Sequence, residues 1–220
     1  MSKEILKIKV KRVKRSHSMR LKIGRNGEPV LTLPFWIPQK VGLLWAEKQQ
    51  NWIQKNSFIP NYFHEGQKIS FLGQEVVIQH SQQRCQTHLE KGILWVSGDL
   101  DFLARRVGDF VKKEFFPYLQ KCVTEKEAQI NVKHSRLTLR DTSSRWGSCS
   151  SKGALSFCWR LAMAPEIVID YMVAHEVAHL KHMNHSPSFW KTVSELTPYT
   201  CQAQKWLKQY GNCLPTTKKQ

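Results

Sequence analysis

One stretch decides how this sequence is interpreted: His175-Glu176-Val177-Ala178-His179. On an α-helix, residues four positions apart lie one turn apart on the same face. The two imidazole rings therefore project toward a common point, which suits a zinc ion. Glu176 lies about 100° around the helix from His175, where its carboxylate can take a proton from metal-bound water. The stretch therefore predicts both a metal site and a reaction.

The motif lies in a predicted helix that is mostly apolar. Pro165 and Glu166 suit the first turn of this helix. Its apolar residues are Ile167, Val168, Tyr171, Met172, Ala174 and Ala178. A pair of ordinary core histidines is the alternative interpretation. We prefer a metal site, because nothing else in the sequence explains two histidines on the buried side of such a helix.

A catalytic zinc site has three protein ligands and one water molecule, and two histidines compete for the third position. On a continuous helix His182 would lie about 10.5 Å along the axis from His175, which is too far for one ion. His185 returns to the metal only if the chain turns, and Met183-Asn184 can supply the turn because Asn tolerates the left-handed conformation. We expect His185 to be the third ligand and His182 to face solvent or support the ligands from behind. Three imidazoles favour zinc but also accept cobalt or nickel.

The chain has 220 residues, of which 41% are hydrophobic, and a formal net charge of +17. It is long enough for one globular domain or two closely joined ones. Between Lys3 and Arg25, ten basic residues face only Glu4. This run is either a solvated basic strand surface or a site that attracts nucleic acid, nucleotide or acidic protein.

The sequence also predicts the cellular location of the protein. No apolar run approaches the roughly 18 residues of a membrane helix, and no apolar signal-peptide core follows the basic N-terminus. We therefore expect a cytoplasmic protein that does not associate with membranes. Cysteines occur at 85, 122, 149, 158, 201 and 213 without any C-x-x-C pair, so we expect them to be reduced.

The first hundred residues are predicted to be rich in β-hairpins. Lys7 to Val13 alternates apolar and basic residues, which favours a half-buried strand. Residues 19–23 and 29–33 are predicted to pair through the turn Arg25-Asn26-Gly27. Two more hairpins are expected between Lys68 and Val96, around glycine-containing turns.

One amphipathic helix is predicted within this region, from Gln39 to Lys55. Its tryptophans, Trp45 and Trp52, can stack on nucleic-acid bases, but a tryptophan stripe at helical spacing is more often core. We assign both to the core.

The second half of the chain alternates predicted helices and strands. A helix is expected from Asp101 to Cys122, with Asp99 or Asp101 as N-cap and with Pro117 kinking or splitting it. Strands are expected within Val132 to Arg140 and Leu155 to Leu161. After the motif helix, further helices begin at Ser186-Pro187 and at Thr197-Pro198, the last ending near Gly211.

Several motifs in a fixed order carry a family resemblance. They are Arg145 to Ser150, Trp159 to Leu161, Ala164-Pro165, Asp170-Tyr171, His175 to Leu180, Asn184 to Ser186 and Phe189-Trp190. Together they resemble the YgjP-like metallopeptidases, relatives of the SprT-like zincins, over most of the chain. The sequence departs from the expected family pattern at Cys158, where Asn is usual, so a polar role of that position is in doubt.

The resemblance implies an α+β fold with a zincin-like catalytic core. This core comprises a backing helix, a small, mostly antiparallel sheet and the HExxH helix, and it follows the N-terminal β-hairpin-rich region. We expect three regions: 1–99, basic and hairpin-rich; 100–213, catalytic; and 214–220, a flexible tail.

The resemblance also implies the roles of the site residues. His175, His179 and His185 match the zinc-ligand positions, and Glu176 matches the catalytic position. The leading hypothesis is a zinc metallopeptidase in which Glu176-activated water attacks the amide of a peptide or protein.

Substrate contacts are predicted beside the motif helix. An edge strand there can pair with an extended substrate, and Arg145, Trp146 and Arg160 are the candidate substrate-binding residues. Two alternative functions are kept open. One is a zinc-dependent phosphohydrolase or pyrophosphatase that acts on nucleotides, and the other is a nucleic-acid-associated protease.

Overall fold

The computed structural model of the chain describes residues 8–23, 28–56, 62–142, 145–211, 214–215 and 217. Their contacts divide the chain into two compact units, Met1–Pro60 and Asn61–Gln220. None of the described helices is long and apolar enough to cross a membrane. The five cysteines in the described residues are free thiols, as predicted. Cys213 and most of the predicted tail lie outside the described residues.

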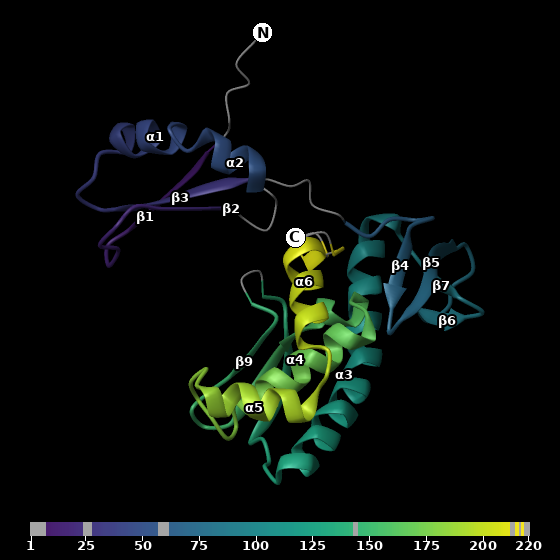
Figure 1. The fold of residues 1–220 in the computed structure, drawn as a ribbon. Helices are drawn as coiled ribbons and strands as arrows, with labels where there is room; N and C mark the ends of the chain where they lie inside the picture. The colour runs from purple at the N-terminus through teal and green to yellow at the C-terminus, as the bar shows by residue number, and fades with distance from the viewer. Residues whose placement is uncertain are drawn as a thin grey trace. The chain divides into compact units, whose positions relative to one another are not determined.

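The first unit contains a three-stranded sheet with two helices beside it (Figure 1). Its strands are β1 (Lys9–Val13), β2 (Arg20–Ile23) and β3 (Pro29–Pro34), in the order β1-β3-β2. Strands β2 and β3 are antiparallel, so the predicted pairing is confirmed. The predicted turn at Asn26-Gly27 lies outside the described residues. Strand β1 is parallel to β3.

Two short helices replace the single helix predicted from Gln39 to Lys55. They are α1 (Gln39–Glu47) and α2 (Gln50–Asn56). The break lies at Gln49, whose N–H donates to the carbonyl of Ala46 at 3.0 Å, three residues back, so that the helix tightens and ends. Trp45 packs against the core of this unit as predicted. Trp52 is 41% exposed, so its assignment to the core was wrong.

The second unit begins with a four-stranded sheet in the order β4-β5-β7-β6. Its strands are β4 (Lys68–Phe71), β5 (Gln74–Ser81), β6 (His88–Glu90) and β7 (Ile93–Ser97). Both predicted hairpins are confirmed, through Leu72-Gly73 and Lys91-Gly92. The φ angles are 48° and 79° in the first turn and 50° and 78° in the second. Positive φ at both positions defines type I′ turns, whose twist matches that of paired strands.

A long helix, α3 (Leu103–Ile130), follows a 3₁₀ turn at Leu100–Phe102. Asp99 caps the turn, because its carboxylate accepts the backbone N–H two residues ahead at 3.0 Å. The helix runs beyond its predicted end, and Pro117 lies inside it without dividing it. Phe115 and Leu119, on either side of the proline, are fully buried. Their packing outweighs the one backbone hydrogen bond that Pro117 removes.

Three strands and three helices complete the second unit. The strands are β8 (Arg136–Arg140), β9 (Gly147–Cys149) and β10 (Ala154–Cys158), in the order β8-β10-β9. A 3₁₀ segment (Trp159–Met163) precedes α4 (Glu166–Ala178), α5 (Pro187–Leu196) and α6 (Thr200–Tyr210). Strand β10 is parallel to β8 and antiparallel to β9, so the sheet is mixed rather than mostly antiparallel. The prediction differs because β10, the central strand, lies beside β8 and runs in the same direction.

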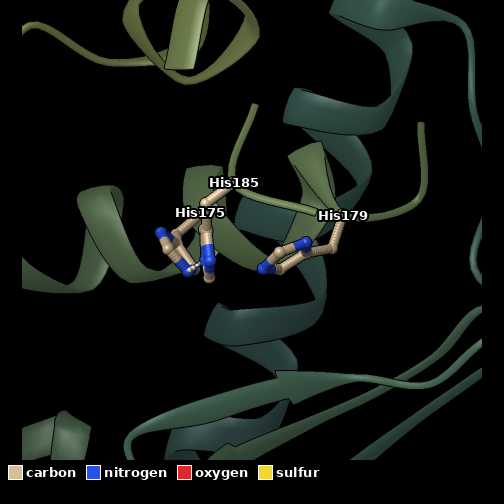
Figure 2. Close-up of side chains that lie close together, drawn as sticks. All are labelled: His175, His179 and His185. Atoms are coloured by element: carbon tan, nitrogen blue, oxygen red, sulfur yellow. Dashed lines mark hydrogen bonds between the residues drawn. The ribbon is translucent and has the colours of Figure 1, made fainter. Parts of the chain in front are cut away.

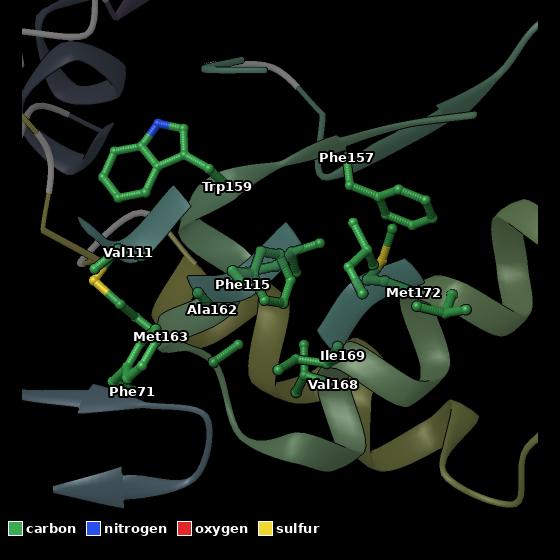
Figure 3. Close-up of a cluster of buried hydrophobic side chains, with 14 of the residues drawn as sticks. Phe71, Val111, Phe115, Phe157, Trp159, Ala162, Met163, Val168, Ile169 and Met172 are labelled. Carbon is green, nitrogen blue, oxygen red and sulfur yellow. The ribbon is translucent and has the colours of Figure 1, made fainter. Parts of the chain in front are cut away.

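One hydrophobic core joins the elements of the second unit (Figure 3). It includes Phe71 of β4, Phe115 of α3, Phe157 of β10 and Ile169 of α4. The described contacts therefore separate the two units after Pro60, whereas the sequence predicted a boundary at residue 99. The predicted α+β class is confirmed, with a backing helix, a small sheet and the motif helix in one core.

A buried ion pair ties α3 to α4. Lys126 Nζ lies 2.6 Å from Asp170 Oδ1 and donates to the carbonyl of Leu196 at 2.8 Å. The side chain of Lys126 is 8% exposed and that of Asp170 is 33% exposed. One ammonium group thus connects α3, α4 and the end of α5, and its removal would leave two acceptors without their donor.

We expect Lys126→Met to lower the free energy of unfolding by about 3 kcal/mol. This value is at the lower end of the range for breaking a buried ion pair, because Asp170 is partly hydrated. Urea denaturation followed by tryptophan fluorescence measures this loss. Lys121→Met is the matched control, since this lysine of the same helix is 77% exposed and lies 4.0 Å from Glu125. The control should change stability by less than about 0.5 kcal/mol, and equal losses would contradict the interpretation.

Candidate metal centre

Helix α4 presents the HExxH motif at the end of an almost enclosed segment. Nine of its 13 residues are buried. Pro165 stands at the N-cap and Glu166 in the first turn, as predicted. His175 and His179 are half-buried at the other end, one helical turn apart. Because the helix is packed on most sides, both rings are directed to one place.

The chain turns immediately after α4, and this brings His185 back to the motif. Leu180 N–H donates to Val177 O at 3.0 Å, and Lys181 N–H donates to Ala178 O at 3.1 Å. These bonds to carbonyls three residues back end the helix before His182. The chain bends at Met183 and Asn184, where the turn was predicted, but Asn184 does not adopt the left-handed conformation, because it is not among the described residues with positive φ.

The three predicted ligands converge (Figure 2). Their ring centroids lie 5.0 Å apart for His175 and His179, 5.1 Å for His175 and His185, and 4.8 Å for His179 and His185. All three offer a ligand atom, and these atoms lie within 4.8 Å of one another. The structure therefore brings together residues that are up to ten positions apart in the sequence.

The spacing of two of the three ligand nitrogens fits a zinc ion. Two nitrogens at about 2.0–2.1 Å from one tetrahedral zinc ion lie about 3.4 Å apart. Nε2 of His175 and Nε2 of His185 are 3.2 Å apart. His175 and His185 are thus spaced as two ligands of the zinc ion that the motif implies.

Hydrogen bonds on the far side of two rings orient them. Nδ1 of His179 lies 3.0 Å from the carbonyl oxygen of His182, which can only accept, so Nδ1 carries the proton and Nε2 keeps its lone pair. Nδ1 of His175 lies 3.5 Å from the hydroxyl of Tyr171, which Gln204 holds from α6 at 3.0 Å. His182 therefore supports the site through its backbone carbonyl, and it is not a member of the cluster.

An aromatic wall from α5 supports the histidines. The ring of Phe189 is fully buried and lies 5.0 Å from His175, 4.5 Å from His179 and 4.8 Å from His185. Trp190 stacks on His185 at 5.8 Å. Sequence periodicity did not identify this wall, although Ser186 caps α5 and starts it where predicted.

Burial favours the neutral form of two of the imidazoles. Together with the proximity of His179 and His185, it lowers the pKa of His175 to about 4. Burial also lowers the pKa of His179. A neutral imidazole has the free lone pair that a metal needs, so His175 and His179 do not have to lose protons at neutral pH before a metal binds.

Glu176 lies beside the cluster and is 4% exposed. Burial raises its pKa to about 7, and the positive charge of Arg145 opposes this rise. Burial and the nearby Glu176 together raise the pKa of Cys149 to about 11, so this thiol stays protonated.

Because Gly147 of β9 has no side chain, it leaves space for the carboxylate of Glu176. A Cβ atom on Gly147 would stand 2.4 Å from Oε1 and 2.6 Å from Cγ of Glu176. Any side chain at residue 147 would therefore displace the carboxylate. This contact was not predicted, although the glycine lies in the Trp146-Gly147-Ser148-Cys149 motif.

The three predicted substrate-binding residues have different surroundings. Arg145 is exposed and acts electrostatically on Glu176. Arg160 donates to the carbonyl of Thr142 at 2.6 Å and lies over the ring of Trp146 at 5.5 Å. Arg160 and Trp146 are thus engaged with each other, which favours a structural role for both, while Arg145 keeps its exposed position.

The family model described as YgjP-like, metallopeptidase domain, matches residues 17–210. No curated protein matches the chain. Among solved structures, the zymogen of Pyrococcus abyssi abylysin is 17% identical, with 46% of this chain and 99% of that chain covered and a TM-score of 0.39. The zymogen of Methanocaldococcus jannaschii jannalysin is 20% identical, with 44% and 97% covered and a TM-score of 0.36. Both are metallopeptidases.

We expect Gly147→Ala to lower hydrolytic activity about a hundredfold, because a displacement of Glu176 by about 1 Å misplaces the reacting groups. The bound zinc content, measured by atomic absorption, should not change. Ser70→Ala is the control, since Ser70 of β4 is exposed and belongs to the sheet that contributes no residue to the cluster. Full activity of Gly147→Ala would show that the close contact has no part in the reaction.

Proposed function

The chain belongs to the YgjP-like metallopeptidase family, and we propose that it cleaves peptide bonds with a zinc ion held by His175, His179 and His185. The observation that carries this proposal is the convergence of three imidazoles beside a buried carboxyl group. Three protein ligands leave a fourth position open, as a catalytic zinc site requires.

The groups around the cluster have separate parts in the proposed reaction. A bound zinc ion supplies a Lewis acid, which polarises the scissile carbonyl and acidifies a water molecule. Glu176 accepts the proton of the attacking water at its carboxylate and delivers it to the leaving amine. Its pKa of about 7 suits a group that must take up and release a proton at neutral pH.

The position of β9 supports an extended peptide as substrate. The order β8-β10-β9 leaves β9 at the edge of its sheet, and Gly147 of this strand approaches Glu176 closely. A substrate added as a further strand would bring its carbonyl group near the carboxylate. Arg145, two residues before β9, would then stabilise the negative charge that develops on the carbonyl oxygen.

A second candidate function is hydrolysis of nucleotides at the same metal. One observation favours it: Arg145, whose charge acts on Glu176, also lines a groove of about 670 Å³ together with Arg136 and Arg140. Guanidinium groups bind phosphate oxygens in a bidentate manner. The same Glu176 would serve either reaction, so the substrate decides between them.

We expect His185→Ala to abolish stoichiometric zinc binding, while His182→Ala retains it. The reason is that His185 contributes an imidazole to the cluster, whereas His182 contributes a carbonyl that survives the substitution. Isothermal titration of the metal-free proteins with zinc measures the difference. Loss of zinc in His182→Ala with retention in His185→Ala would reverse the proposed ligand set.

We expect Glu176→Gln to bind zinc as the wild type does but to lose at least about a hundredfold in turnover, because an amide cannot accept the proton. Peptide libraries and nucleoside triphosphates should be assayed in parallel with both proteins. Peptide cleavage that disappears in the variant supports the peptidase, and phosphate release that disappears supports the second candidate. Undiminished turnover by Glu176→Gln would refute its role in either reaction.

A further inference from the structure

The sheet of the first unit has one covered face. Leu31 and Leu33 of β3 are fully buried and form a small core with Ala46 of α1. Gly42 lets α1 approach closely, because a Cβ atom there would stand 2.4 Å from Cδ2 of Leu33. Helix α1 therefore closes the face to which the odd-numbered residues of β3 point.

The opposite face is basic. In the strand register, Thr32 of β3 is flanked by Lys11 of β1 and Arg20 of β2. One pair further along, Val30 is flanked by Lys9 and Lys22. Residues paired side by side point to the same side of a sheet. Four cationic side chains thus stand in two rows across this face, away from α1.

A hollow of about 630 Å³ lies on the same face. Its lining includes Arg15, His17, Arg20 and Lys22, with the hydroxyl groups of Ser16 and Thr32 between them, and no acidic residue is among the described residues that line it. Guanidinium, ammonium and hydroxyl groups all donate hydrogen bonds to phosphate oxygens. The hollow is therefore chemically suited to a phosphate backbone.

An exposed aromatic residue lies beside His17, which lines this hollow. Trp36 is 61% exposed, and its ring centroid lies 6.4 Å from that of His17. A large exposed ring beside cationic groups is the combination with which proteins hold single strands, since bases stack on the ring while the cations follow the phosphates.

We propose that the basic face of the first unit binds single-stranded nucleic acid, with phosphates on Arg20, Lys22, Lys9 and Lys11 and a base stacked on Trp36. A duplex keeps its bases stacked inside and cannot use Trp36 in this way. The proposal concerns the first unit alone and holds whether or not the metal centre cleaves peptides.

Fluorescence anisotropy of the full-length protein with a labelled oligo-dT or oligo-rU 20-mer tests the proposal. Binding should be measurable at 50 mM salt and should fall steeply as salt increases. Arg20→Gln with Lys22→Gln should weaken binding about tenfold and reduce the slope of log K against log[salt] by about 1.4, since each phosphate contact to a single strand contributes about 0.7. Lys9→Gln with Lys11→Gln is a second test pair on the other side of β3.

Matched controls separate this surface from the general charge of the chain. Lys40→Gln with Lys48→Gln removes the same charge from exposed residues of α1 and its C-cap, beside the covered face, and should leave the affinity within about twofold. Trp36→Ala should weaken binding about tenfold without changing the salt slope. Trp52→Ala, which removes the exposed tryptophan of α2, should have little effect.

Three results would overturn the proposal. They are absence of binding at 50 mM salt, equal losses in the α1 control and the sheet variants, and equal affinity for the single strand and for its duplex. Circular dichroism of each variant establishes that the fold is kept.

Discussion

The candidate site depends above all on the burial of α4. Removal from water disfavours every charged form, and it acts on bases and acids in opposite directions. The same burial therefore lowers the pKa of His175 to about 4 and raises that of Glu176 to about 7. A neutral imidazole is the form that binds a metal, and a carboxyl group with a raised pKa is the form that exchanges protons at neutral pH. One physical cause thus prepares both parts of the proposed chemistry.

Burial alone does not direct the rings, and the remaining constraints come from distant parts of the chain. Phe189 of α5 stands behind all three imidazoles. Gln204 of α6 reaches His175 through Tyr171, and Gly147 of β9 leaves space for Glu176. Each support belongs to a different element, so the geometry of the site follows from the packing of the whole second unit. For this reason a substitution of Gly147, which is far from the motif in the sequence, is expected to displace the carboxylate of Glu176.

The parts of this arrangement that follow local periodicity could be predicted from the sequence. His175 and His179 share a face because a helix repeats every 3.6 residues, and the Leu72-Gly73 and Lys91-Gly92 turns follow from their turn residues. The parts that depend on contacts between distant residues could not. Pro117 stays within α3 because of its neighbours' packing, Trp52 is exposed because α1 ends early, and Gly147 is constrained by a side chain 29 positions away. His185 lies in the cluster with His175 and His179, and the helix ends several residues before Asn184.

The charge of the chain is unevenly divided between the two units. Residues 1–60 contain thirteen Lys and Arg against three Glu, whereas the rest of the chain contains twenty-one against fourteen Asp and Glu. Because α1 covers one face of the first sheet, strand alternation directs Lys9, Lys11, Arg20 and Lys22 to the other face. Part of the excess charge therefore lies on one surface, and a polyanion attracted to it would be held by the first unit. The metal cluster belongs to the second unit, so binding by the first and hydrolysis by the second rest on separate residues and can be lost independently.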